Sequence, residues 1–128
     1  MAMKVFDTNM IIRYLVGDIP EQSQQVLKIL NTEKVMVFPE VIAEVVYIMK
    51  NFYGCSRELT ANVISDFLSL DAVQAEHSAG LMKGLELYQT TSLDFVDCLL
   101  AGLHIAENYE ICTFDKKLKK LIQRKDEE

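Results

Sequence analysis

Residues 4–17, KVFDTNMIIRYLVG, contain the pattern that decides the fold. Lys4-Val5-Phe6 predicts a short apolar strand, and the polar segment Asp7-Thr8-Asn9 follows it directly. Apolar side chains then recur at helical spacing as far as Gly17, so we expect a helix immediately after the strand. An aspartate at such a junction is explained either as a helix N-cap or as a functional group at the carboxyl end of a strand.

The rest of the chain repeats this alternation of strands and helices. Asp18 and Pro20 are expected to begin a second helix, with Asp18 as its N-cap. Further strands are predicted at 35–38, 72–74 and 111–113. Further helices are predicted over 39–53, over 57–69 with Ser56 as N-cap, over 76–89 and 94–107, and in the C-terminal run 116–125. Because strands alternate with helices, we expect an α/β fold with a parallel sheet between two helical layers.

Length and composition predict one globular domain over residues 1–128, with half of the residues hydrophobic and a quarter charged. No apolar run approaches the roughly 18 residues that span a bilayer, and no signal peptide precedes the first strand. Three cysteines without a C-x-x-C pair favour reduced thiols and a cytoplasmic location. The two histidines share no motif, which disfavours a zinc site.

The formal charge of −6 argues against nucleic acid at first sight, but it hides an asymmetry. Residues 1–115 are strongly acidic, whereas residues 116–125 hold six basic side chains and no acidic one. The basic run is explained either as the solvated face of a helix that packs Leu118, Leu121 and Ile122 inward, or as an edge that contacts phosphates. Divalent metal ions allow an acidic pocket to bind a polyanion. The negative net charge therefore excludes neither explanation of the basic run.

Four acids stand in unusual contexts, and each also has an ordinary explanation. Asp7 follows a strand, Glu44 interrupts an apolar helix, and Asp97 begins another apolar helix. Asp115 ends the predicted strand at 111–113. The ordinary explanations are helix caps, first-turn acids, a polar helix face or a turn. Asp94 shares a helix face with Asp97 and is expected to act at least in part as a cap.

Taken together, the four acids predict a metal site at the carboxyl edge of the sheet. Carboxylates that converge there repel one another by several kcal/mol unless cations lie between them. Oxygen ligands alone favour Mg²⁺ or Mn²⁺, and such a site suits hydrolysis of phosphodiesters by an activated water. No serine, threonine or cysteine stands in a motif for covalent catalysis.

Four motifs in order then resemble a known family. Val5-Phe6-Asp7-Thr8-Asn9, with Ile11-Ile12-Arg13-Tyr14-Leu15 behind it, resembles the opening of PIN-domain nucleases, and more narrowly of VapC-type toxins of prokaryotic toxin–antitoxin pairs. The family's second, third and fourth acids are matched in Ile42-Ala43-Glu44-Val45, Asp97-Cys98-Leu99-Leu100-Ala101 and Thr113-Phe114-Asp115. The resemblance covers nearly the whole chain.

The resemblance implies a three-layer α/β/α sandwich and a Mg²⁺- or Mn²⁺-dependent endoribonuclease with RNA as substrate. The implied metal ligands and catalytic residues are Asp7, Glu44, Asp97 and Asp115. Thr8 and Asn9 are implied as polar support near the metal, Thr113 as a hydroxyl that orients Asp115, and Asp94 as a companion of Asp97. Arg13 is explained either as a ligand of a phosphate or of a neighbouring carboxylate, or as a solvated helix residue, and we favour the solvated residue.

A cognate antitoxin and a homodimer are the expected protein partners. The resemblance implies both, and the sequence adds an independent reason for the dimer: the helices over 39–53 and 57–69 carry apolar side chains around much of their circumference. These side chains are Val46, Tyr47, Met49, Phe52, Tyr53 and Phe67. An unusually large buried core is the alternative explanation.

Two other classes of function remain open. A receiver-type phosphoacceptor domain also collects acids and Mg²⁺ at a parallel-sheet edge, although Asp115-Lys116 imitates its acceptor and lysine poorly. A binding module with this fold and no turnover is the other alternative, and the intact acids argue against it.

Overall fold

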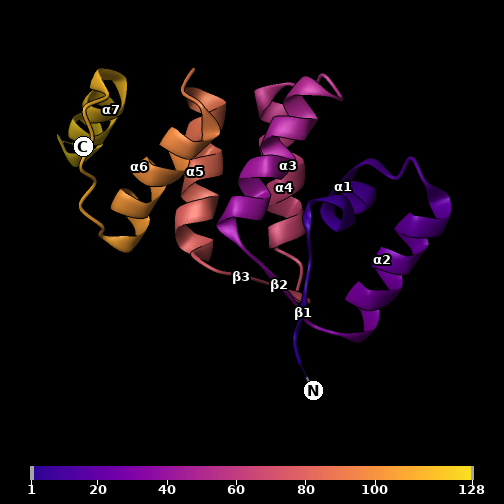
Figure 1. The fold of residues 1–128 in the computed structure, drawn as a ribbon. Coiled ribbons are helices and arrows are strands. Elements are labelled where there is room, and N and C mark those ends of the chain that lie inside the picture. The colour runs from indigo at the N-terminus through magenta and orange to yellow at the C-terminus, as the bar shows by residue number, and fades with distance from the viewer. Residues whose placement is uncertain (1, 128) are drawn as a thin grey trace. The chain divides into compact units, whose positions relative to one another are not determined.

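The structure is a computed structural model that describes residues 2–127, and the chain forms two compact units (Figure 1). The N-terminal unit is Met1–Glu76, and the C-terminal unit is His77–Glu128. Within residues 2–127, no helix has the length and apolar character that crossing a bilayer requires.

A short parallel sheet lies in the N-terminal unit, as the sequence predicted. Its strands are β1 (Lys4–Val5), β2 (Val35–Val37) and β3 (Val73–Ala75), in the order β1-β2-β3. Val5 pairs with Met36, and Met36 pairs with Gln74. Val35 and Val37 of the central strand are completely buried, and β2 has a neighbouring strand on each edge. The α/β class with a short parallel sheet is therefore confirmed.

Four helices accompany the sheet in this unit: α1 (Thr8–Val16), α2 (Pro20–Thr32), α3 (Pro39–Asn51) and α4 (Arg57–Leu68). Gly17 ends α1 in the left-handed conformation (φ 69°), which costs glycine little. Ser56 caps α4 by accepting the backbone N–H of Leu59 at 3.0 Å, as predicted. Phe6 and Phe67 stack at 6.4 Å in the core.

The prediction that Asp18 caps the second helix is wrong. The N-cap position of α2 belongs to Ile19, whose side chain cannot cap, and Pro20 occupies the first turn, where its missing N–H costs nothing. The Asp18 carboxylate instead accepts hydrogen bonds from Arg13 and Tyr53. Two hydrogen bonds, one of them from a charged donor, outweigh one capping bond.

Three helices form the C-terminal unit: α5 (Ser78–Thr90), α6 (Phe95–Glu107) and α7 (Lys116–Glu127). Helices α5 and α6 lie side by side (Figure 1) and approach closely at their glycines. A Cβ on Gly102 would lie 2.4 Å from the carbonyl oxygen of Gly80, which explains the small residues that the sequence has there. Leu118 and Leu121 of α7 are buried, as expected of the basic helix.

The predicted strand at 111–113 is wrong. Residues 108–115 form an irregular connection, in which Cys112 is exposed and Phe114 is 99% exposed. A strand needs a neighbouring strand for its backbone hydrogen bonds, and the described residues of the C-terminal unit contain none. The apolar residues of this segment therefore did not indicate a strand.

Candidate active site

Asp7 lies at the junction between β1 and α1 and caps the helix. Its Oδ1 accepts the backbone N–H of Met10 at 3.0 Å, so the ordinary explanation of this aspartate holds. Capping engages only one of the two carboxylate oxygens, and the residue is exposed. Asn9 is also exposed, whereas Thr8 is buried at 8% exposure. The cap thus fixes Asp7 at the helix N-terminus while leaving an oxygen for a ligand.

A cavity of about 440 Å³ opens beside Asp7 in the N-terminal unit. Residues of α1 and its cap line one side, and residues at the start of α2 line the other. The lining residues are Asp7, Asn9, Met10, Arg13, Ile19, Gln22, Gln25 and Val26. The cavity therefore combines one carboxylate, one guanidinium and several amide side chains.

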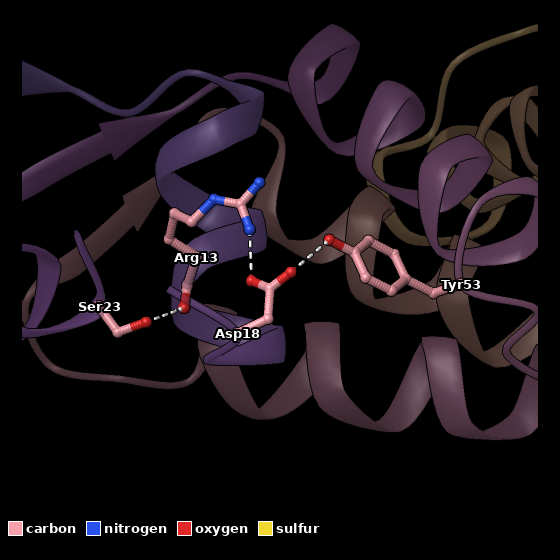
Figure 2. Close-up of polar contacts among 4 residues, drawn as sticks. All are labelled: Arg13, Asp18, Ser23 and Tyr53. Atoms are coloured by element: carbon pink, nitrogen blue, oxygen red, sulfur yellow. Dashed lines mark hydrogen bonds and ion pairs between the residues drawn. The ribbon is translucent and has the colours of Figure 1, made fainter. Parts of the chain in front are cut away.

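Arg13 is held in this cavity wall by a polar network (Figure 2). Its guanidinium donates to Asp18, and the Tyr53 hydroxyl donates to the other oxygen of Asp18 at 3.1 Å. The hydrogen bond to Asp18 raises the pKa of Arg13. Partial desolvation opposes the effect at Asp18, but the bonds from Arg13 and Tyr53 outweigh it and lower the pKa of that carboxyl.

The interpretation of Arg13 as a solvated helix residue is therefore wrong. Its side chain is only 17% exposed and neutralises a neighbouring carboxylate. The hydroxyl of Ser23 donates to the backbone carbonyl of Arg13 at 2.9 Å, which ties α2 to the same turn of α1 (Figure 2). The fixed guanidinium adds the one positive group among the side chains that line the cavity beside Asp7.

Glu44 lies on the exposed face of α3. The buried stripe of this helix consists of Ile42, Val45, Val46 and Met49, which recur at helical spacing, and Glu44 falls off that stripe. Glu40, one turn earlier, is exposed as well. An exposed carboxylate needs no partner, so the surrounding apolar sequence did not by itself require a ligand for Glu44.

Asp97 is the electrostatically unusual acid of the C-terminal unit. It stands in the first turn of α6 and is half-buried. Desolvation raises the pKa of Asp97, and the negative charges of Asp115 and Asp94 raise it further. Two further aspartates of this unit therefore lie near enough for their charges to act on Asp97. A cation beside Asp97 would remove the repulsion that its two neighbours cause.

Asp115 begins α7 and is positioned by two hydrogen bonds of its own segment. Its Oδ1 accepts the backbone N–H of Leu118 at 2.9 Å, as in a helix cap, and its own N–H donates to the Thr113 hydroxyl at 3.0 Å. Asp94 occupies the N-cap position of α6, but its side chain makes no capping hydrogen bond. The expected cap at Asp94 is therefore limited to its backbone carbonyl, which accepts from Cys98 at 3.1 Å.

The predicted acids divide between the two units. Asp7 and Glu44 belong to the N-terminal unit, with Thr8 and Asn9; Asp97 and Asp115 belong to the C-terminal unit, with Asp94 and Thr113. Among residues 2–127, no three His, Cys, Asp or Glu side chains gather closely enough to hold an ion. Within one unit, the structure brings together the charges of Asp94, Asp97 and Asp115.

Comparisons with known proteins cover most of the chain. The model of the family described as PIN domain matches residues 4–122. A VapC ribonuclease of Aquifex aeolicus (strain VF5) is 28% identical over 129 residues, which cover 93% of this chain and 92% of that protein. No solved structure matches the chain.

Proposed function

The chain belongs to the PIN domain family, and on that premise we propose that it is a metal-dependent endoribonuclease of a toxin–antitoxin pair. Family membership confirms the predicted fold class, a PIN-like α/β/α sandwich with a short parallel sheet. The proposal treats residues 1–128 as one nuclease domain. The observation that carries the activity is the family match over residues 4–122, together with the likeness to a VapC ribonuclease over 93% of the chain. The carboxylates of Asp94 and Asp115, whose charges act on Asp97, add support.

The donor atoms of the candidate residues suit a hard divalent ion. The proposed ligands are Asp7, Glu44, Asp97 and Asp115, which supply oxygen atoms only and so suit Mg²⁺ or Mn²⁺ rather than zinc. Asp97 is half-buried and close enough to two other carboxylates for their charges to oppose its ionisation. When bound, the ion lowers the pKa of the attacking water and offsets negative charge on the phosphodiester.

The remaining side chains have supporting roles in this proposal. The cap at Met10 fixes Asp7, and the Thr113 hydroxyl fixes the backbone of Asp115. Asn9 lines the same cavity as Asp7 and can donate to a phosphate oxygen, while the buried Thr8 anchors the turn between them. Asp94 adds negative charge near Asp97 without serving as a ligand.

The proposal also names partners and a location. RNA is the substrate in the cytoplasm, and a cognate antitoxin restrains the enzyme. A homodimer is supported by large exposed apolar side chains on and just after α3, since Tyr47 is 67% exposed and Phe52 is 79% exposed. An antitoxin gene next to the gene of this protein would support the proposed antitoxin partner.

The test is cleavage of end-labelled RNA by the purified full-length protein, first in EDTA and then with added Mg²⁺ or Mn²⁺. We expect cleavage only with the metal, and a loss of at least about a hundredfold in Asp97→Asn. Glu40→Gln is the matched control, because it removes one exposed negative charge that the proposal does not use.

Three results would contradict the proposal. Cleavage that is unaffected by EDTA would contradict the proposed dependence on a metal ion. Metal binding without cleavage of any RNA would favour a binding module, and stoichiometric phosphorylation by a small phosphodonor would favour a phosphoacceptor domain.

A further inference from the structure

A second hollow of about 560 Å³ lies entirely within the C-terminal unit. One wall is a face of α7, and the other is the end of α5 with the connection to α6. We call it the basic groove; its lining residues are Thr90, Thr91, Ser92, Leu93, Lys117, Lys120, Leu121, Gln123, Arg124 and Glu127. None of the acids proposed as metal ligands lines it.

Three cations of the groove stand in one row on α7. Lys117, Lys120 and Arg124 are three and four positions apart, so they share a face of the helix. At about 1.5 Å of rise per residue, the row extends over roughly 10 Å. Leu118 and Leu121 are 1% and 3% exposed, so buried leucines anchor the helix that carries the row.

Hydroxyl groups face this row from the other wall. Thr91 Oγ1 already donates to the carbonyl of Leu87 at 2.9 Å, and Thr90 Oγ1 makes only long contacts of 3.4 Å to the carbonyls of Glu86 and Leu87. Ser92 also lines the groove. Hydroxyls opposite a row of cations are the side chains that bind phosphate oxygens in nucleic-acid complexes.

We propose that the basic groove binds the sugar–phosphate backbone of single-stranded RNA. The inference rests on the proposed function for its RNA substrate and deepens it by adding a second contact surface. A row of about 10 Å spans about three nucleotide steps at roughly 3.4 Å each, the axial spacing of one strand in B-DNA, so it is long enough to contact several successive phosphates. The net charge of −6 repels RNA elsewhere, so attraction is concentrated in this basic segment.

Recognition in the groove does not depend on base sequence. Its lining contains no aromatic side chain on which a base could stack, and lysine and hydroxyl contacts to phosphate carry no sequence information. The groove therefore holds and orients the strand, while the choice of cleavage site is made elsewhere. Glu127 at one end of the lining limits the basic surface on that side.

The test uses two double variants of the full-length chain that remove the same amount of charge. Lys117→Gln with Lys120→Gln changes the groove, and Lys116→Gln with Lys119→Gln changes exposed lysines of the same helix outside it. Lysine and glutamine have similar helix propensities, so both variants should keep α7. Binding of fluorescent single-stranded RNA is followed by anisotropy in EDTA over a KCl series, so that metal-dependent cleavage does not interfere.

We expect the groove variant to bind at least about tenfold more weakly, by a similar factor on oligo(U), oligo(A) and mixed sequences. The slope of log K against log[KCl] should fall by about 1.4, or roughly 0.7 for each phosphate that the variant no longer neutralises. The control variant should change much less on both measures.

Equal weakening in the two double variants would overturn the proposal, because general charge would then explain it. A groove variant that keeps RNA binding but no longer binds polyglutamate would assign the groove to an acidic protein segment instead. Groove-dependent RNA binding by a protein that cleaves no RNA would support the groove and contradict the proposed function. RNA cleavage by a protein whose RNA binding does not change in the groove variant would support the proposed function and contradict the groove.

Discussion

Gly102 of α6 packs against the backbone of Gly80 of α5 without room for a side chain. A Cβ on Gly102 would lie 2.4 Å from the Gly80 carbonyl oxygen and 2.7 Å from the nitrogen of Gly84. Both obstacles are backbone atoms of a helix, which cannot move individually. The close approach is therefore a fixed requirement of the α5–α6 pair, on which Asp97 is carried.

Gly102→Ala should lower the free energy of unfolding by about 1–3 kcal/mol or more, because the two helices must separate to admit the methyl group. Urea unfolding followed by circular dichroism measures this. Gly80→Ala is the comparison, since its Cβ would meet side-chain atoms of Leu103 and Glu107 rather than backbone atoms. These side chains can shift, at the cost of disturbing the hydrogen bond that the Glu107 carboxylate accepts from the Gly80 N–H. A Gly80→Ala variant that is destabilised as much as Gly102→Ala would contradict the distinction between backbone and side-chain obstacles.

Mg²⁺ or Mn²⁺ should raise the melting temperature of the wild-type protein if the proposed acids bind it. A ligand at 100 times its Kd stabilises the folded state by about 2.7 kcal/mol. Asp7→Asn should abolish this gain while leaving metal-free stability nearly unchanged, because asparagine can also accept the capping N–H of Met10. Glu40→Gln should keep the full gain in differential scanning fluorimetry. A melting curve that does not respond to metal would refute metal binding by the proposed acids.

Asp94→Asn should reduce RNA cleavage less than Asp97→Asn does. The charge of Asp94 acts on Asp97, but its side chain forms no cap and the proposal gives it no metal contact. We expect a several-fold decrease in kcat/KM for Asp94→Asn against at least about a hundredfold for Asp97→Asn. Steady-state cleavage of one labelled RNA compares the two variants. Equal decreases would show that Asp94 is itself a ligand.

The sequence predicted most elements because local signals were strong. The cap at Ser56, the left-handed Gly17 and the stripe of Ile42, Val45, Val46 and Met49 are each encoded within a few residues. Asp18 was misassigned because its partner Tyr53 is 35 positions away, and no local pattern reveals that contact.

Tertiary context also explains what the sequence could not show at the site. The segment 111–113 has the residues of a strand but lacks a neighbouring strand among the described residues of its unit. The basic groove needs Lys117 and Thr91 together, and only the packing of α7 on its buried leucines brings these residues to one hollow. The charge effect of Asp115 on Asp97 was predictable only as part of a family motif.

Protonation of His104 should stabilise the end of α7. Its Nε2 lies 2.7 Å from Asp126 Oδ1 and its Nδ1 lies 2.7 Å from the Tyr109 carbonyl, so both nitrogens donate when the ring is charged. The hydrogen bond with Asp126 raises the pKa of His104, and the Tyr109 carbonyl adds to the effect. The stabilisation is therefore full below the unfolded-state pKa of about 6.5 and is lost as pH rises through the higher folded-state value.

Asp126→Asn should lower the pKa of His104 and reduce this pH dependence of stability. The effect on the free energy of unfolding should stay within about 1 kcal/mol, because the Asp126 side chain is 58% exposed and solvent screens the pair. Titration of the histidine ring protons by NMR measures the pKa directly, with His77 as the internal reference. An unchanged His104 titration in Asp126→Asn would contradict the assigned pair.

The exposed apolar side chains at the end of α3 allow the proposed homodimer interface to be tested. Val46, Met49 and Phe67 are buried and Tyr53 is half-buried, so the expected surplus of apolar surface reduces to Tyr47 and Phe52, which are mostly exposed. Light scattering at tens of micromolar should show a dimer, and replacing both residues by serine should shift it toward monomer. Leu27→Ser, at a side chain 46% exposed on α2, is the control for a polar change elsewhere and should leave the dimer intact. A wild-type protein that is monomeric at these concentrations would refute the interface, because about 8 kcal/mol of association free energy already gives a micromolar Kd.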